Sequence, residues 1–199
     1  ESDYSNEVII AAAKKVTYTD LGNVSWAVEA IEGLAGKKVF DTNAGSKFYP
    51  EQNITKGEYC AILVRSLELG NSAAGRYADV TPKHRYYKEI MVASRLGIVT
   101  SDKNNKIYPD QLITREQAGV MLALALKASD KPLPEQDSSI LKKFADYKQI
   151  SEESAERIAA VCGAGILTGR EEKGKIYLRV TSKVTRAEAA VMIYKALSL

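Results

Sequence analysis

The feature that most constrains this chain is a pattern that occurs three times. Each copy begins with an aromatic residue, any residue and an aspartate, and later has a threonine followed three residues on by Glu or Gln. The aspartates are Asp20, Asp79 and Asp146, and the threonines are Thr55, Thr114 and Thr185. A chain built from one recurring unit buries its core between neighbouring copies, so we expect any functional groove to lie between copies.

Each of these threonines opens a predicted helix. Thr followed three residues later by Glu or Gln is typical of a capping box, in which the two side chains satisfy each other's backbone N–H groups. A separate amphipathic helix precedes each box. In the second and third copies that earlier helix is predicted to end at Gly97 and Gly165, in left-handed C-cap geometry, whereas Lys38 takes this place in the first copy.

The pattern predicts an all-α fold, a pseudo-threefold arrangement of three helix-loop-helix repeats with short accessory helices. The expected segments are a leading helix at 1–16, repeats at 17–70, 71–128 and 144–199, and a linker with a short helix at 129–143. We align the three loops on Tyr49, Tyr108 and Tyr177, which follow a lysine and an apolar residue, and expect these tyrosines to be wedged into the core.

Composition permits a sizeable core and excludes several functional classes. Hydrophobic residues make up 45% of the chain, and no apolar run is long enough to cross a bilayer, so we expect no membrane insertion. The first residues do not resemble a signal peptide, so an export signal was either removed or never present. The net charge of +3 comes from interspersed acidic and basic residues, which disfavours a nucleic-acid partner.

The sequence offers no convergent catalytic or metal-binding set. Cys60 occupies a position that is Gly119 or Ala190 in the other copies, so we expect a small buried residue, and neither it nor Cys162 has metal-site spacing. The single histidine, His84, is expected to be exposed. We therefore predict no enzyme, no metal and no cofactor; if the chain belongs to an enzyme, the activity resides in another domain.

One basic residue lies in the first turn of each capped helix: Lys56, Arg115 and Arg186. A positive charge there opposes the helix dipole, so stability alone does not explain its presence in all three copies. Binding of an anion does explain it, because first-turn backbone N–H groups are unpaired and because Arg presents a planar fork to a carboxylate. Since Lys offers only a point charge, we expect the Arg115 and Arg186 grooves to bind better.

These motifs resemble the S-layer homology family. The likeness rests on the aromatic-x-Asp starts, on Trp26 six residues after the first of them, on the helix exit Leu96-Gly97-Ile98 and on Val184-Thr185-Arg186-Ala187-Glu188. The resemblance implies a tandem set of three such repeats at the bacterial cell surface. It also implies non-covalent anchoring through anionic secondary cell-wall polysaccharide bound in the grooves between repeats, often by a pyruvate ketal on an amino sugar.

The resemblance further implies which residues form the grooves. The carbohydrate-binding candidates are Lys56, Arg115, Arg186, Trp26, Asp20, Asp79, Gly97 and Gly165. We interpret the aspartates first as N-caps or turn formers and weigh Trp26 equally as a core residue and as a sugar platform. Because Arg85 matches Trp26 in the second copy and Leu178 replaces a proline in the third loop, we do not expect three equivalent grooves.

Two other functions stay open at this point. A structural or self-assembling repeat would dock on other surface proteins and keep its binding without Arg115 and Arg186. Alternatively, the chain is the non-catalytic anchor of a larger surface enzyme. In each case we expect an extracellular location at the cell wall or S-layer.

Overall fold

The computed structural model describes residues 17–41, 47–70 and 75–199 of the chain. The leading helix predicted at 1–16 lies outside these residues. The α-helices are α1 (Val28–Ala35), α2 (Lys56–Ser66), α3 (Tyr87–Arg95), α4 (Arg115–Ala128), α5 (Glu152–Gly163) and α6 (Arg186–Leu197). The 3-10 turns are η2 (Ser25–Ala27), η3 (Ser138–Lys143) and η4 (Tyr147–Gln149), and β1 (Arg170–Glu172) pairs with β2 (Lys175–Tyr177) as an antiparallel hairpin. The predicted all-α class is confirmed.

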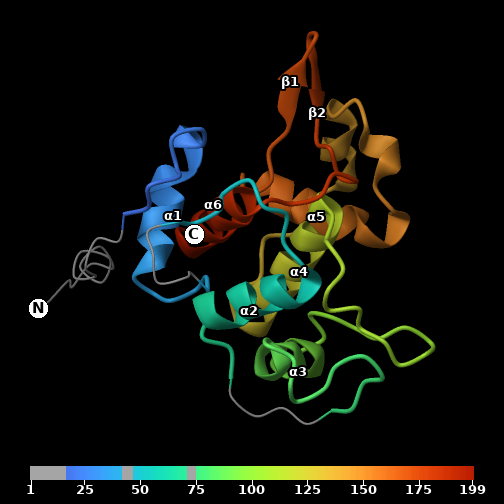
Figure 1. The fold of residues 1–199 in the computed structure, drawn as a ribbon. Helices are drawn as coiled ribbons and strands as arrows, with labels where there is room; N and C mark the ends of the chain where they lie inside the picture. The colour runs from blue at the N-terminus through green and yellow to red at the C-terminus, as the bar shows by residue number, and fades with distance from the viewer. Residues whose placement is uncertain (1–16, 42–46, 71–74) are drawn as a thin grey trace, which may run out of the picture.

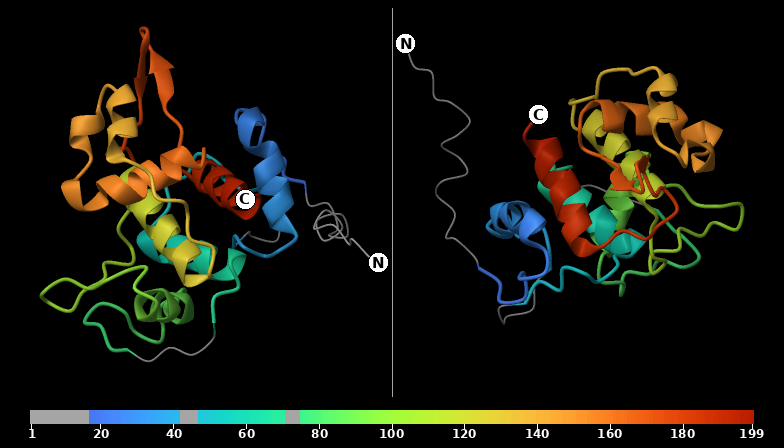
Figure 2. Two further views of the ribbon diagram at one scale, coloured as in Figure 1. Left: turned by 180° about the vertical axis from the view of Figure 1, so that it is seen from behind. Right: turned by 90° about the horizontal axis from the view of Figure 1, so that it is seen from above.

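The helices form a central bundle with an outer layer (Figure 1). The second helices of the copies, α2, α4 and α6, contact one another in the centre, and α1, α3 and α5 lie outside them. Each outer helix packs on the central helix of another copy: α3 on α2, α5 on α4 and α1 on α6. The hairpin projects beyond the helices (Figure 2). The copies are thus joined in a closed cycle, which confirms the pseudo-threefold arrangement.

Small residues allow the helices to approach closely at one matched position. Cys60 and Ala190 are fully buried, and a Cβ added to Gly119 would lie 2.8 Å from Cδ1 of Ile158. Both cysteines are free and buried, and burial raises the pKa of the Cys60 thiol to about 12. Cys60 is therefore the inert packing residue that the sequence predicts.

The helix caps follow the predicted pattern with one exception. Thr55, Thr114 and Thr185 each accept a hydrogen bond from the backbone N–H three residues later, at 3.2 Å. The capping box is complete in α4 and α6. In α2 the carboxylate of Glu58 pairs with Arg186 of the third copy.

The first helix of each copy ends in left-handed backbone geometry. Gly97 and Gly165 have φ of 71° and 70°, as predicted, and Lys38 adopts the same geometry with φ of 53°. Apolar residues follow these exits and are buried, which fixes the path of the chain back into the core.

The three aspartates clamp loops rather than cap helices. Each accepts two backbone N–H groups from the loop of its own copy: Asp20 from Phe48 and Tyr49 (2.9 and 2.8 Å), Asp79 from Ile107 and Tyr108 (3.0 and 2.7 Å), and Asp146 from Leu178 and Arg179 (2.8 and 2.7 Å). The bound loop residues lie 28–33 positions further along the chain, so the interpretation of the aspartates as N-caps is wrong.

These clamps correct the predicted alignment of the third loop. Tyr49, Tyr108 and Arg179 each have a φ of 57–58° and occupy equivalent places, so the partner of the two tyrosines is Arg179 and not Tyr177. The hairpin β1–β2 shifts the pattern by two residues, and Val180 takes the place of the proline. Tyr49 is 48% exposed, so its predicted place in the core is also wrong. The buried wedges are the preceding residues, Phe48, Ile107 and Leu178.

Candidate functional site

The three loops meet in a ring of backbone hydrogen bonds. The N–H of Ile54 donates to the carbonyl of Val184 (3.0 Å), Val184 donates to Ile113 (3.1 Å), and Ile113 donates to Ile54 (3.3 Å). All three side chains are fully buried. Each copy therefore contacts both others just before its capping threonine.

The first turn of each central helix docks on the loop of the next copy. The N–H groups of Lys56 and Gly57 donate to the carbonyls of Gln111 and Pro109, both at 2.8 Å. In the second copy, the N–H groups of Arg115 and Glu116 donate in the same way to the carbonyls of Ser182 and Val180. In the third copy, those of Arg186 and Ala187 donate to the carbonyls of Gln52 and Pro50. We call these contacts the 1–2, 2–3 and 3–1 junctions. The expectation that first-turn N–H groups are free for an anion is wrong, because protein carbonyls occupy them.

The three first-turn cations lie inside these junctions at equivalent places. Lys56 Nζ donates to the carbonyl of Ile107 (2.7 Å), Arg115 Nε to that of Leu178 (3.0 Å) and Arg186 Nε to that of Phe48 (2.8 Å). Each acceptor is the loop residue whose N–H is clamped by an aspartate. The contacts supply a structural reason for a positive charge in the first turn, which sequence spacing could not show because the partner belongs to another copy.

In two junctions the cation is also paired with a carboxylate. Arg115 Nη1 lies 3.0 Å from Oε1 of Glu188, and Arg186 forms an ion pair with Glu58. Arg186 is 6% exposed and stacks on the rings of Phe48 and Phe40, at 4.8 and 5.3 Å from the ring centres. Burial raises the pKa of Glu58, although the neighbouring Arg186 opposes this shift.

The 1–2 junction has a neutral residue where the other two have a carboxylate. Gln117 occupies the place of Glu188 and Glu58, three residues after the capping threonine. Within the described part of the chain, Lys56 has no ion pair; it donates to Ile107, and its ammonium lies 5.8 Å from the ring centre of Tyr108. Half-burial lowers the pKa of Lys56, and Asp79 acts in the opposite direction.

His84 also borders the 1–2 junction. Its side chain is 16% exposed, so the prediction of an exposed residue is wrong. The ring Nδ1 accepts the backbone N–H of Tyr86 (3.1 Å), and Nε2 lies 3.3 Å from Oδ1 of Asp110. A Cβ added to Gly57 would lie 3.2 Å from its Cε1, which places the imidazole against the start of α2.

Trp26 and the two glycines occupy more open positions. Trp26 is 57% exposed on η2, which contacts α6, so it is not a core residue. Among the described residues, and apart from the glycine and its two chain neighbours, no atom lies within 4 Å of a Cβ built on Gly97 or Gly165.

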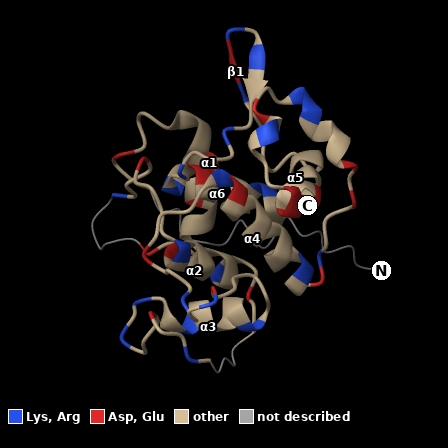
Figure 3. Ribbon diagram, turned by 90° about the vertical axis from the view of Figure 1, so that its right-hand side faces the viewer, with Lys and Arg blue, Asp and Glu red and all other residues tan. Residues whose placement is uncertain are grey.

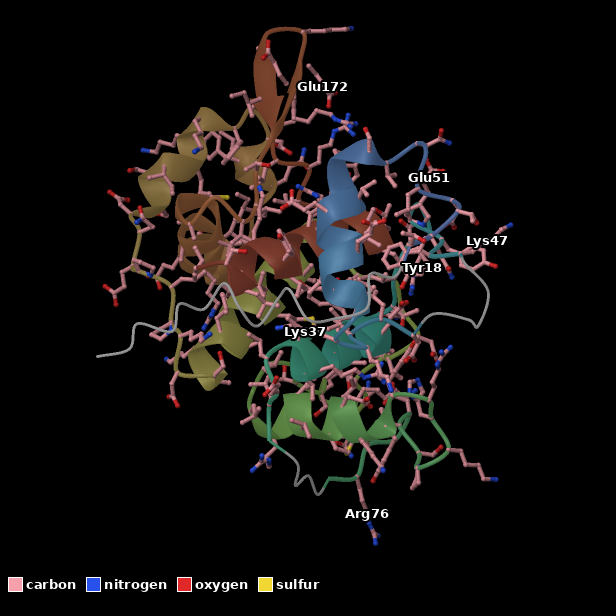
Figure 4. All side chains as sticks on the ribbon, turned by 90° about the vertical axis from the view of Figure 1, so that its left-hand side faces the viewer. Tyr18, Lys37, Lys47, Glu51, Arg76 and Glu172 are labelled. Atoms are coloured by element: carbon pink, nitrogen blue, oxygen red, sulfur yellow. The ribbon has the colours of Figure 1, made fainter. Side chains whose placement is uncertain are left out.

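Tyr18 contacts Phe48, with ring centres 5.4 Å apart, and Figure 4 shows it on the same side of the molecule as Lys47 and Glu51.

A charged cluster that the sequence did not reveal joins the first two copies. Arg65 of α2 pairs with Asp41 and with Glu89 of α3, both at 2.7 Å, and Arg85 lies 2.9 Å from Asp41. Burial tends to raise the pKa of Asp41, but the hydrogen bond from Arg65 and the charges of Arg65 and Arg85 outweigh it and lower the pKa. Arg85, which matches Trp26 in sequence, therefore takes part in an ion-pair network.

The sequence was compared with known families and proteins. The model of the S-layer homology domain matches residues 17–60 and 76–118, which run from the start of each of the first two copies into the beginning of its capped helix. The chain belongs to the S-layer homology family. The third copy, which that match does not include, has the same aspartate clamp, capping box and first-turn arginine.

Known proteins with the same segment have different overall activities. The chain is 29% identical to Exoglucanase XynX of Acetivibrio thermocellus over 91% of its length, and 29% identical to Amylopullulanase of Thermoanaerobacterium thermosulfurigenes over 89%. It is 24% identical to Surface-layer 125 kDa protein of Lysinibacillus sphaericus over 95%. It spans only 16%, 9% and 16% of these proteins.

The S-layer homology repeats are therefore a shared cell-surface anchoring module and not the source of one enzymatic activity. In the described residues no helix is long and apolar enough to cross a membrane, and no group of three or more His, Cys, Asp or Glu is placed to hold a metal ion. Basic and acidic residues are interspersed over the ribbon (Figure 3).

Proposed function

We propose that these repeats anchor their parent protein by binding an anionic polysaccharide of the bacterial cell wall at the junctions between copies. The observation that carries this proposal is the equivalent placement of Lys56, Arg115 and Arg186, one in each junction. A cation held in a partly desolvated site attracts a carboxylate more strongly than one in bulk water. The family resemblance points to a pyruvate ketal on an amino sugar as the acidic group.

The other candidate residues have supporting roles in this proposal. Exposed Trp26 offers an apolar ring to a sugar face. Asp20 and Asp79 hold the loops beside the cations, and Gly97 and Gly165 turn the chain toward those loops. We propose that these four residues shape the grooves and that the cations and Trp26 make the direct contacts.

The parent protein is a further part of the proposal. Relatives that share this segment include proteins named as glycan-degrading enzymes and a surface-layer protein. We propose that the repeats likewise tether a larger polypeptide, whose remaining segments set its activity.

A structural role without glycan binding is the second candidate, and one observation favours it. Arg115 and Arg186 are already paired with Glu188 and Glu58, so a structural ion pair explains two of the three cations without any ligand. In that case the repeats would dock on other surface proteins or on one another.

Co-sedimentation with purified bacterial wall sacculi distinguishes these candidates. We expect the protein to sediment with sacculi that retain the secondary polymer and to stay in solution with sacculi from which that polymer was chemically removed. Equal sedimentation with both preparations would reject the glycan proposal. Self-association at the same concentration without sacculi, measured by analytical ultracentrifugation, would support the structural role.

A further inference from the structure

We infer that the junctions differ in their capacity for an anion and that the 1–2 junction, where Gln117 leaves Lys56 without a carboxylate partner, takes the acidic group of the wall polymer. This inference rests on the proposed function and narrows it to one junction. It also reverses the ranking expected from the sequence, in which the two arginines were the better binders.

The difference arises from a single position in the capped helices. Gln117, Glu188 and Glu58 are the third residues of α4, α6 and α2. Each faces the junction formed with the preceding copy in the cycle, because Glu188 pairs with Arg115 and Glu58 pairs with Arg186. The third residue of each central helix thus lies beside the first-turn cation of the preceding copy, and for Gln117 that cation is Lys56. An amide there keeps the capping box complete but adds no negative charge.

Lys56 differs from the two arginines in that no protein carboxylate accepts from it in the described residues, whereas each arginine donates to a glutamate. An ammonium has three N–H donors, and the described contacts of Lys56 Nζ include one acceptor, the carbonyl of Ile107. Its partial burial weakens screening by water, so a carboxylate arriving at Nζ gains more than it would at an exposed lysine. Asp79 is the nearby carboxylate, and both of its oxygens already accept backbone N–H groups.

The arginine junctions are less favourable for a second anion. Arg115 donates to the carbonyls of Leu178 and Thr168 and to Glu188, and Arg186 donates to two carbonyls and to Glu58. An incoming carboxylate would have to displace a protein carboxylate and would be repelled by it. Gln117 is exposed, whereas Glu58 and Glu188 are partly covered, so the 1–2 junction is also more open.

The chemistry around Lys56 suits an acidic sugar. The ring of Tyr108 lies within cation–π distance of the ammonium, at 5.8 Å from the ring centre, and its hydroxyl donates to Asp102 (2.7 Å) at the loop surface. This aromatic face can contact the apolar side of a pyranose while Lys56 receives the acidic substituent. The third loop has Arg179 in place of Tyr108 and so lacks this surface.

The decisive variant is Gln117→Glu, which supplies the missing carboxylate without removing any binding group. Glu occupies this position in α6, where the capping box is complete, so we expect the variant to be folded. The new carboxylate should pair with Lys56 and lower retention on polymer-bearing sacculi by about tenfold or more, the effect of losing one charge-assisted hydrogen bond.

Gln136→Glu is the matched control, because it adds the same charge to an exposed side chain in the linker, outside the three junctions. We expect it to sediment like the wild type. Lys56→Gln, measured alongside, should lose retention without adding a carboxylate, and urea unfolding checks that each variant is folded.

The possible outcomes separate the two proposals. If the wild-type protein sediments equally with sacculi that carry the secondary polymer and with sacculi that lack it, the proposed function itself is rejected. Polymer-dependent sedimentation that survives both Gln117→Glu and Lys56→Gln overturns the assignment to the 1–2 junction but leaves the proposed function standing. Equal loss in Gln117→Glu and Gln136→Glu would mean that added negative charge acts non-specifically, which also overturns the assignment.

Discussion

Arg186 illustrates how a motif residue can serve stability before it serves binding. Its guanidinium is buried against two phenylalanine rings and paired with Glu58. Such a pair gains little over a well-packed apolar pair, but removal of one partner leaves an uncompensated buried charge.

We therefore expect Arg186→Ala to lower the free energy of unfolding by about 3–5 kcal/mol, measured by urea denaturation. The sequence alone pointed only to an anion-binding role for Arg186. As a control, Arg186→Met combined with Glu58→Gln should recover part of the loss because no charge then stays buried. A double variant no more stable than Arg186→Ala would contradict this explanation.

Thr114 contributes to stability through a local contact. Its side chain accepts the backbone N–H of Gln117, and the side-chain oxygen of Gln117 accepts the backbone N–H of Thr114. We expect Thr114→Ala to cost about 1 kcal/mol in urea denaturation. Thr100→Ala, at an exposed position without such a cap, should leave the midpoint unchanged, and an equal loss in both variants would rule out the cap as the cause.

Asp41 should make the protein sensitive to acid. Because its folded-state pKa is lowered, its contribution to stability is fully present above the ordinary carboxyl pKa, near about 4, and is lost as the pH falls through the lower folded-state pKa. We expect Asp41→Asn to flatten the dependence of the urea midpoint on pH below about 4. Glu51→Gln, which changes an exposed carboxylate, should leave the dependence as it is in the wild type.

Contact between helices depends on small residues where α4 meets α5. Gly119 faces Cδ1 of Ile158, and a Cβ added to Gly119 would clash with this methyl group unless Ile158 moved. Gly→Ala gains about 1 kcal/mol of helix propensity, but the clash with Ile158 opposes that gain.

We expect Gly119→Ala to be more favourable in an Ile158→Val background, which lacks the opposing methyl group, by about 0.5 kcal/mol or more. A double-mutant cycle from urea denaturation measures this coupling. Additive effects would show that the two residues do not restrict one another.

The cyclic packing predicts that the copies fold together. α1 packs on α6, and the ring through Ile54, Ile113 and Val184 needs all three loops. We expect removal of residues 129–199 to abolish cooperative urea unfolding of the rest, monitored by circular dichroism. A sharp transition with wild-type midpoint in the truncated protein would show that two copies suffice.

The parts of the fold that sequence predicted are those set by neighbours along the chain. The caps at Thr114 and Thr185 and the left-handed glycines depend on residues within a few positions, so their spacing is informative. The third loop was misaligned because the Lys-apolar-Tyr pattern ending at Tyr177 lies in an inserted hairpin. The Arg186–Glu58 pair could not be read from spacing, since its members belong to copies far apart in sequence.

The exchange of contacts around the cycle also affects how such sequences can diverge. Lys56 and Gln117 lie in different copies but share one junction, as do Arg115 and Glu188. A charge change at one member alters the surroundings of the other, so compensating substitutions should arise between copies and not within them. Inherited variation in this protein is therefore expected to follow three pairs of positions, each spanning two repeats.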